Sequence, residues 1–95
     1  MGRLKKQFVE VFDLSPEVVL DLPLLMFIGN QNLFIENHKG VRYYHDNQII
    51  IKVSDKYIII EGQALVIDEI NSDNLFISGS INSISYKDGN GGEKS

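Results

Sequence analysis

Short apolar segments separated by regularly spaced turn residues fill this sequence from residue 24 onward, and this rhythm is what most constrains the fold. Turn-forming residues recur at intervals close to the roughly 8 to 12 residues typical of all-β domains. The segments between them are rich in Ile, Val, Phe and Tyr, and are too short for ordinary helices. We therefore predict an all-β domain of about seven or eight short strands, arranged as a meander, a roll or a small sandwich.

The predicted strands are 24–28, 32–37, 41–45, 48–53, 57–61, 64–68, 74–78 and 81–86. Three of these segments, NLFIEN, YIIIEG and NLFISG, share an apolar triplet that is followed by Glu or Ser and then by Asn or Gly. Asn and Gly tolerate a positive φ angle, so each segment is predicted to be a strand that ends in a tight turn. These turns would fall at Asn37, Gly62 and Gly79.

The N-terminal residues follow a different period. Apolar side chains at helical spacing predict a short amphipathic helix within residues 1–14. Its apolar face comprises Leu4, Phe8, Val11 and Phe12, and its polar side carries Arg3, Lys5 and Lys6. This helix could pack on the sheet, meet a partner or lie on an anionic membrane surface. Residues 15–86 would form the β domain, and the polar residues 87–95 are predicted to be a disordered tail.

Several predicted strands are apolar on both faces, because Ile, Leu or Phe residues follow one another directly along the chain. Successive side chains of a strand point to opposite faces of a sheet. A chain of 95 residues makes one small domain, so the second face must meet a second sheet, the N-terminal helix or another copy of the chain. We expect at least one face to meet another copy, in a homo-oligomer.

Composition argues against several chemical functions. The chain has no Cys, which removes thiolate metal sites and thiol nucleophiles, and a net charge of −4 argues against nucleic-acid binding. Tyr43 and Tyr44 beside Arg42 could form a stacking platform for bases, but such sites also need a positive groove. We interpret the two tyrosines as packing between strands.

Polar side chains also lack the spacing of a catalytic or metal site. His38 and His45 lie near Glu36 and Asp46 in or beside predicted turns, without the converging ligands that a metal requires. Asp68 and Glu69 are adjacent, so they would point to opposite faces if their strand continues. Nucleophile-elbow, phosphate-binding and dinucleotide motifs are absent from the sequence. We predict no catalytic, metal or cofactor residues.

An ordered set of short motifs resembles the YabP/YqfC family of small endospore sporulation proteins, and the YqfC branch in particular. The motifs are DLP at 21–23, IGN at 28–30, LFIENHKGV at 33–41, IIIKV at 49–53, IIIEGQALVI at 58–67 and LFISGSINSISY at 75–86. The resemblance covers roughly residues 5 to 86, and the SPEVVLDLP stretch matches the opening of that branch.

The resemblance implies a protein without enzymatic activity, made in the mother cell during sporulation and acting at the forespore envelope. It also implies a cytoplasmic protein that meets a YqfD-type membrane protein at the membrane around the forespore. The amphipathic N-terminal helix offers a second way to contact that membrane. Residues Asn37, His38 and Gly40 match the family pattern and could form a fixed turn presented to a partner.

Two functions from different classes therefore remain open. The first is a self-associating structural or scaffolding component of the forespore envelope. The second is a soluble β domain that binds or senses a small ligand, which a deep apolar pocket with converging polar groups would favour.

Overall fold

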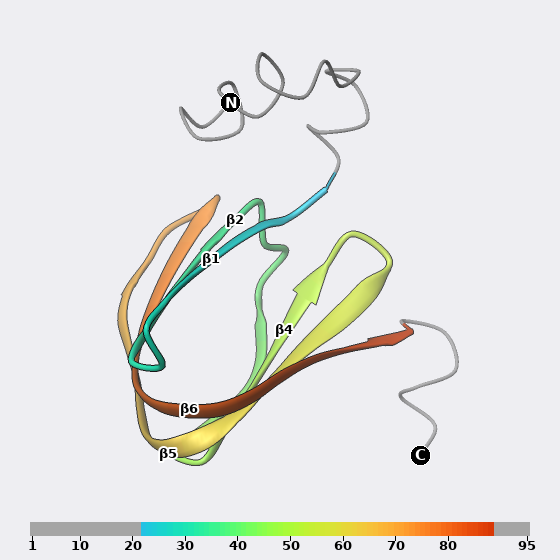
Figure 1. The fold of residues 1–95 in the computed structure, drawn as a ribbon. Helices are drawn as coiled ribbons and strands as arrows, with labels where there is room; N and C mark the ends of the chain where they lie inside the picture. Colours follow the sequence, from blue (N-terminus) through green and yellow to red (C-terminus); the bar gives the residue numbers. More distant parts are fainter. Residues whose placement is uncertain (1–21, 89–95) are drawn as a thin grey trace.

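The computed structural model describes residues 22–88, which form one six-stranded antiparallel sheet (Figure 1). The strands are β1 (Leu24–Ile28), β2 (Asn32–Glu36), β3 (Val41–His45), β4 (Gln48–Val53), β5 (Lys56–Ile70) and β6 (Asn74–Asp88). Their order across the sheet is β1-β2-β6-β5-β4-β3. β2 therefore pairs with β6 and not with β3, which follows it in the chain. Within the described residues no helix is long and apolar enough to span a membrane.

Alternation of side chains divides each strand into a buried and an outer face. In β4, Ile49, Ile51 and Val53 are buried, whereas the residues between them are partly exposed. Complete burial of an Ile or Leu side chain contributes about 2 kcal/mol to folding, so this face dominates the stability of the sheet. The core comprises Leu33, Ile35, Ile49, Ile51, Val53, Ile58, Ile60, Leu65, Leu75, Ile77 and Ile81.

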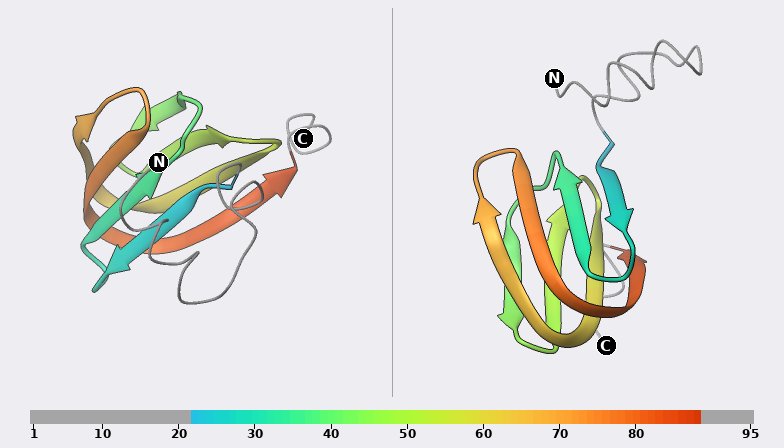
Figure 2. Two further views of the ribbon diagram at one scale, coloured as in Figure 1. Left: turned by 90° about the horizontal axis from the view of Figure 1, so that it is seen from above. Right: turned by 60° about the vertical axis from the view of Figure 1, so that its left-hand side comes forward.

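The two longest strands, β5 and β6, have 15 residues each and bend, so that the single sheet folds into two walls (Figures 1 and 2). The first wall contains β1, β2, residues 74–78 of β6 and residues 66–70 of β5. The second wall contains β3, β4, residues 56–61 of β5 and residues 81–88 of β6. Core side chains from both walls form one cluster, so one sheet covers its own inner face.

β5 and β6 are antiparallel neighbours that bend together where their backbones approach each other closely, at two glycines. A Cβ atom on Gly62 would overlap the carbonyl oxygen of Ser80, and one on Gly79 would lie 2.6 Å from the carbonyl oxygen of Ala64. Gly79 has a φ angle of +133° and Ala64 one of +54°, and the pairing register of the strands shifts here. Bulges of this kind bend a strand, so this bulged close approach creates the two walls.

Two of the hairpin turns, β1–β2 and β3–β4, are held at these bends by backbone hydrogen bonds. The carbonyl oxygen of Asp46, in the β3–β4 turn, accepts from the N–H of Leu65 at 2.8 Å. The carbonyl oxygen of Asn30, in the β1–β2 turn, accepts from the N–H of Ile81 at 2.8 Å. Each hairpin is thus attached to the bend of a long strand, which fixes the orientation of the two walls.

The structure confirms the all-β prediction. It has six strands because four of the predicted segments join in pairs to form β5 and β6. Gly62 and Gly79 were predicted to end strands in tight turns. This part of the prediction is wrong, because both glycines lie inside continuous strands, where β5 and β6 approach each other closely. Asn37 has a φ angle of +71° and directly follows the last residue of β2, as predicted.

β6 continues beyond its predicted end, through Lys87 and Asp88, which were assigned to the tail. Both residues pair with β5, and Nζ of Lys56 lies 3.1 Å from Oδ1 of Asp88. This hydrogen bond and the Asp88 charge raise the pKa of Lys56 above its usual value. The remaining tail, 89–95, and the predicted helix within 1–14 lie outside the described residues.

The close approach of β5 and β6 leaves no space for a side chain at Gly62. We expect Gly62→Ala to lower the free energy of unfolding by about 3 kcal/mol or more, because the added Cβ must push two backbones apart. Gly29→Ala is the matched control, since Gly29 has a φ angle of +58° and nothing within 4 Å, and it should cost only about 1 kcal/mol. Urea denaturation followed by circular dichroism measures both losses. Equal losses of unfolding free energy in the two variants would contradict the close approach of the strands at Gly62.

Candidate functional site

The segment from Asn37 to Gly40, predicted to face a partner, connects parts of the chain that are distant in sequence. The backbone N–H of Asn37 donates to the carbonyl oxygen of Asp73 at 2.7 Å, and its Nδ2 donates to the carbonyl oxygen of Leu22 at 3.1 Å. The segment therefore attaches the β2–β3 connection both to the β5–β6 loop and to the residue where the described chain begins.

His38 is the buried centre of this segment, with 5% of its surface exposed. Its Nδ1 accepts from the backbone N–H of Gly40 at 2.9 Å, so the proton is on Nε2, which donates to the carbonyl oxygen of Asn71 at 2.8 Å. Both ring nitrogens are thus engaged within the chain, and His38 connects the two loops. The role of Asn37, His38 and Gly40 in partner binding stays a prediction.

His45 lies apart from this segment, as the exposed last residue of β3, directly before the β3–β4 turn. Its Nδ1 is 3.0 Å from Oδ1 of Asn47 and 2.9 Å from Oδ1 of Asp46. Among residues 22–88, no three His, Cys, Asp or Glu side chains are placed to hold a metal ion together. The two histidines therefore stabilise separate turns.

Tyr43 and Tyr44 occupy opposite faces of β3, so they do not form one stacking platform. Tyr43 stacks on His45 with ring centroids 6.5 Å apart. The hydroxyl of Tyr44 accepts from the backbone N–H of Ile67 at 3.3 Å and donates to the carbonyl oxygen of Leu65 at 3.4 Å. Tyr44 thereby connects the edge of the second wall to β5 in the first wall.

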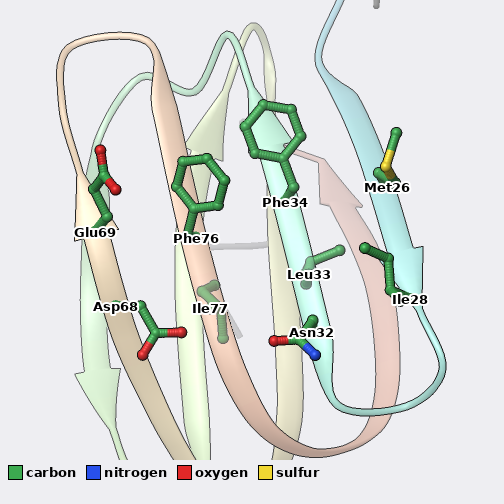
Figure 3. Close-up of a pocket in the computed structure, with 9 residues that line it drawn as sticks. All are labelled: Met26, Ile28, Asn32, Leu33, Phe34, Asp68, Glu69, Phe76 and Ile77. Atoms are coloured by element: carbon green, nitrogen blue, oxygen red, sulfur yellow. The ribbon is translucent and has the colours of Figure 1, made fainter.

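The outer face of the first wall carries a row of large apolar side chains that the sequence did not single out. Met26, Phe34 and Phe76 are neighbours across three paired strands, and the two phenylalanine rings have centroids 4.7 Å apart. They surround an open depression of about 570 Å³ (Figure 3). Phe76 is 37% exposed and Ile28 is 57% exposed. The sequence signal that could have predicted this row is that Phe34 and Phe76 each lie between two core residues of their strand.

Acidic side chains form one side of this depression, on β5. Asp68 and Glu69 both line it, although adjacent strand residues were predicted to point to opposite faces (Figure 3). That expectation is wrong because the β5–β6 register shifts between Ile67 and Glu69, and such a bulge lets two successive residues share a face. Oδ1 of Asp68 accepts from the hydroxyl of Ser78 at 3.1 Å. The surface that results is apolar in its middle and negative at one border.

The hydrogen bonds of His38 predict a large difference between the two histidines. His38→Ala should lower the free energy of unfolding by about 2 kcal/mol, because it leaves buried backbone groups without partners. His45→Ala is the control, and it should change stability by no more than about 0.5 kcal/mol, since that side chain is exposed. Urea denaturation of both variants tests this, and similar losses would contradict the structural role of His38.

Comparisons of the sequence with known proteins identify its family. The model of the YabP family matches residues 23–93, a range that includes all six strands. Over 85 residues the chain is 27% identical to "Uncharacterized protein YqfC" of Bacillus subtilis (strain 168), and the alignment covers 90% of this chain and 91% of that protein. The family expected from the short motifs is thereby confirmed. The chain belongs to the YabP family, in its YabP/YqfC grouping.

Proposed function

We propose that this protein is a non-enzymatic sporulation protein that self-associates as a scaffold at the forespore envelope. It acts in the mother-cell cytoplasm, peripheral to the membrane around the forespore, with a YqfD-type membrane protein as its partner. Membership of the YabP family supports the proposed role in sporulation and the proposed location at the forespore. The observation that carries self-association is the chemistry of β1, which is one edge of the open sheet.

β1 is short, but it lacks the charges, the Pro and the bulge by which natural proteins protect an edge strand from pairing. Its sequence, LLMFI, contains no charged residue and no Pro, and it pairs with β2 without a register shift. Charges, Pro and bulges are the usual protection, because an edge strand has backbone groups ready to pair with another chain. Phe27, on this strand, is 47% exposed.

β3, the opposite edge, shows the protection that β1 lacks. Its register shifts between Val41 and Tyr43, and it carries Arg42 and His45 among its five residues. The contrast between the two edges favours β1 as the surface where copies meet. Two β1 strands paired antiparallel about Met26 would give an isologous dimer with one continuous sheet.

A non-enzymatic role agrees with how the polar groups of the described residues are used. His38 and Tyr44 make hydrogen bonds that hold loops and walls together. The carboxylates at the depression border apolar side chains and a serine hydroxyl. These contacts serve the fold or a docking surface. Among them, no nucleophilic side chain is hydrogen-bonded to a general base that a third group orients in turn.

Binding of a small apolar ligand is the second candidate, and the depression of about 570 Å³ is the observation in its favour. Ligand pockets usually enclose their ligand, whereas this depression is open and lies outside a core filled by side chains. The open shape therefore favours a docking surface for a larger element over an enclosed site for a small ligand. Tight binding of one small molecule by a strictly monomeric protein would favour the ligand instead.

The edge-pairing proposal predicts that one charge on β1 abolishes self-association. We expect the wild-type chain to be a dimer in light scattering and Phe27→Lys to be a monomer, because pairing would bring two ammonium groups together. Tyr43→Lys, on the protected edge, is a matched control because Tyr43 is 46% exposed, and this variant should stay dimeric. A wild-type chain that is monomeric at all concentrations would contradict self-association.

The proposed cellular role predicts where a fluorescent C-terminal fusion gathers in a sporulating host. The wild-type fusion should appear only in the mother cell and collect at the forespore boundary. The Phe27→Lys fusion should be made equally well but stay diffuse, because it cannot form the scaffold. Diffuse wild-type signal in vegetative cells would contradict the sporulation role.

A further inference from the structure

The depression on the outer face of the first wall has a defined chemical character that indicates what can occupy it. Its middle is formed by Met26, Phe34 and Phe76, and one border by Asp68 and Glu69 (Figure 3). Among the nine residues that line it, none is Lys or Arg. An occupant that fits would place apolar side chains in the middle and positive charges over β5.

The chain carries one segment with this combination, directly before the described residues. Within residues 3–13, apolar side chains recur at helical spacing, and all the basic residues lie in the first turn. Apolar positions are Leu4, Phe8, Val11 and Phe12, and basic positions are Arg3, Lys5 and Lys6. We propose that residues 3–13 dock as an amphipathic helix across this depression of the same chain, with the basic end over Asp68 and Glu69.

The dimensions agree with this placement. A helix over 3–13 would be about 16 Å long at 1.5 Å per residue. The depression crosses four neighbouring strands, from β5 through β6 and β2 to β1, which is about 14 Å at 4.8 Å per strand. A helix that begins over β5 therefore ends over β1, the strand into which the chain then continues.

The connecting residues are long enough for docking within one chain. Residues 14–21 separate the segment from Leu22, and an extended stretch of this length spans up to about 30 Å. Leu24 is paired with Glu36 at the end of this same wall, so the chain enters the sheet beside the depression. A short tether of this kind gives a high effective concentration, which favours the same chain over another copy.

Two buried oxygens beside this entry point support an additional covering segment. Glu36 is 8% exposed, and its Oε1 makes no hydrogen bond within the structure. Oδ1 of Asn74, the residue paired with Glu36 across β2 and β6, is likewise buried without a donor. Buried acceptors are nearly always satisfied, so donors are expected at this end of the wall. Under this proposal, we expect the segment that precedes Leu22 to supply them.

Docking on the face and pairing at the edge use different groups. The helix would cover side chains of the outer face, whereas edge pairing uses the backbone of β1. The two proposals can therefore be correct together, and either can fail without the other.

Cysteine cross-linking of the full chain tests the docking, because the natural sequence contains no Cys. Leu4→Cys combined with Glu69→Cys should form a disulfide within one chain under mild oxidation. Leu4→Cys combined with Glu61→Cys is the control, because Glu61 lies on the same strand but in the second wall. We expect the first pair to react about tenfold faster at high dilution. Equal rates, or a disulfide that forms only between copies, would overturn the proposal.

A charge exchange tests the orientation of the helix. In the Leu4→Cys, Glu69→Cys background, Lys6→Glu should slow disulfide formation about fivefold at low salt, because it replaces an attraction with a repulsion. Adding Asp68→Lys should restore the rate, whereas Glu61→Lys should not. A rate that is insensitive to all three changes would overturn the placement of the basic end over β5.

An anionic membrane is the competing occupant for the segment, and the same variants distinguish it. Vesicles of phosphatidylglycerol should leave the rate of the first cysteine pair unchanged if the segment is held on its own sheet. Loss of the disulfide together with sedimentation of the protein on the vesicles would show that the segment prefers lipid, and would overturn the proposal.

Discussion

The close approach of the paired strands β5 and β6 at Gly62 and Gly79 is the contact on which the rest of the structure depends. The two backbones are so close here that an added Cβ atom would overlap the neighbouring strand, and both strands bend at this point. The bend folds one sheet into two walls, and so allows a small chain to cover its own inner face. The hairpin turns are then attached at the bend, and the outer faces and the β1 edge are left for other contacts.

Much of this fold could be predicted from local pattern. The bounds of the first, third and fourth strands agree with the structure, because their turn residues lie directly beside short apolar runs. Gly62 and Gly79 misled the prediction, since glycine marks both a turn and a close approach of two backbones. A turn and a close approach can be distinguished only by knowing where the neighbouring strand lies. That position cannot be read from the local sequence around the glycine.

The outer surface was harder to predict for the same reason. Two-sided apolar strands indicated that a second face needed cover, and Phe34 and Phe76 do alternate with core residues. Their meeting across β2 and β6 depends on a pairing between distant parts of the chain. The position of Asp68 and Glu69 on one face depends on a bulge in β5, whose register is set by β6. Sequence alternation alone therefore assigned these carboxylates to opposite faces.

The motif that the sequence most readily identifies serves the fold. His38 is buried and connects two loops, and Asn37 attaches the same segment to Leu22. The surfaces proposed for assembly and docking draw on residues both inside and outside the motifs: Phe34 and Phe76 lie within them, whereas Met26 and Phe27 do not. Within one motif, alternate residues therefore serve different ends, because Leu33 and Ile35 belong to the core and Phe34 to the outer face.

The pairing of β2 with β6 determines when the chain can fold during its synthesis. The β1–β2 hairpin has no neighbouring strand until residues 74–78 have been made, because its partner in the sheet comes last. Isolated two-stranded hairpins are at best marginally stable in water. Pairings between distant segments also form slowly, since a long loop must close first. The nascent chain therefore leaves the ribosome almost complete before its core can close, and its apolar strands remain open to chaperones, or to other copies, until that moment.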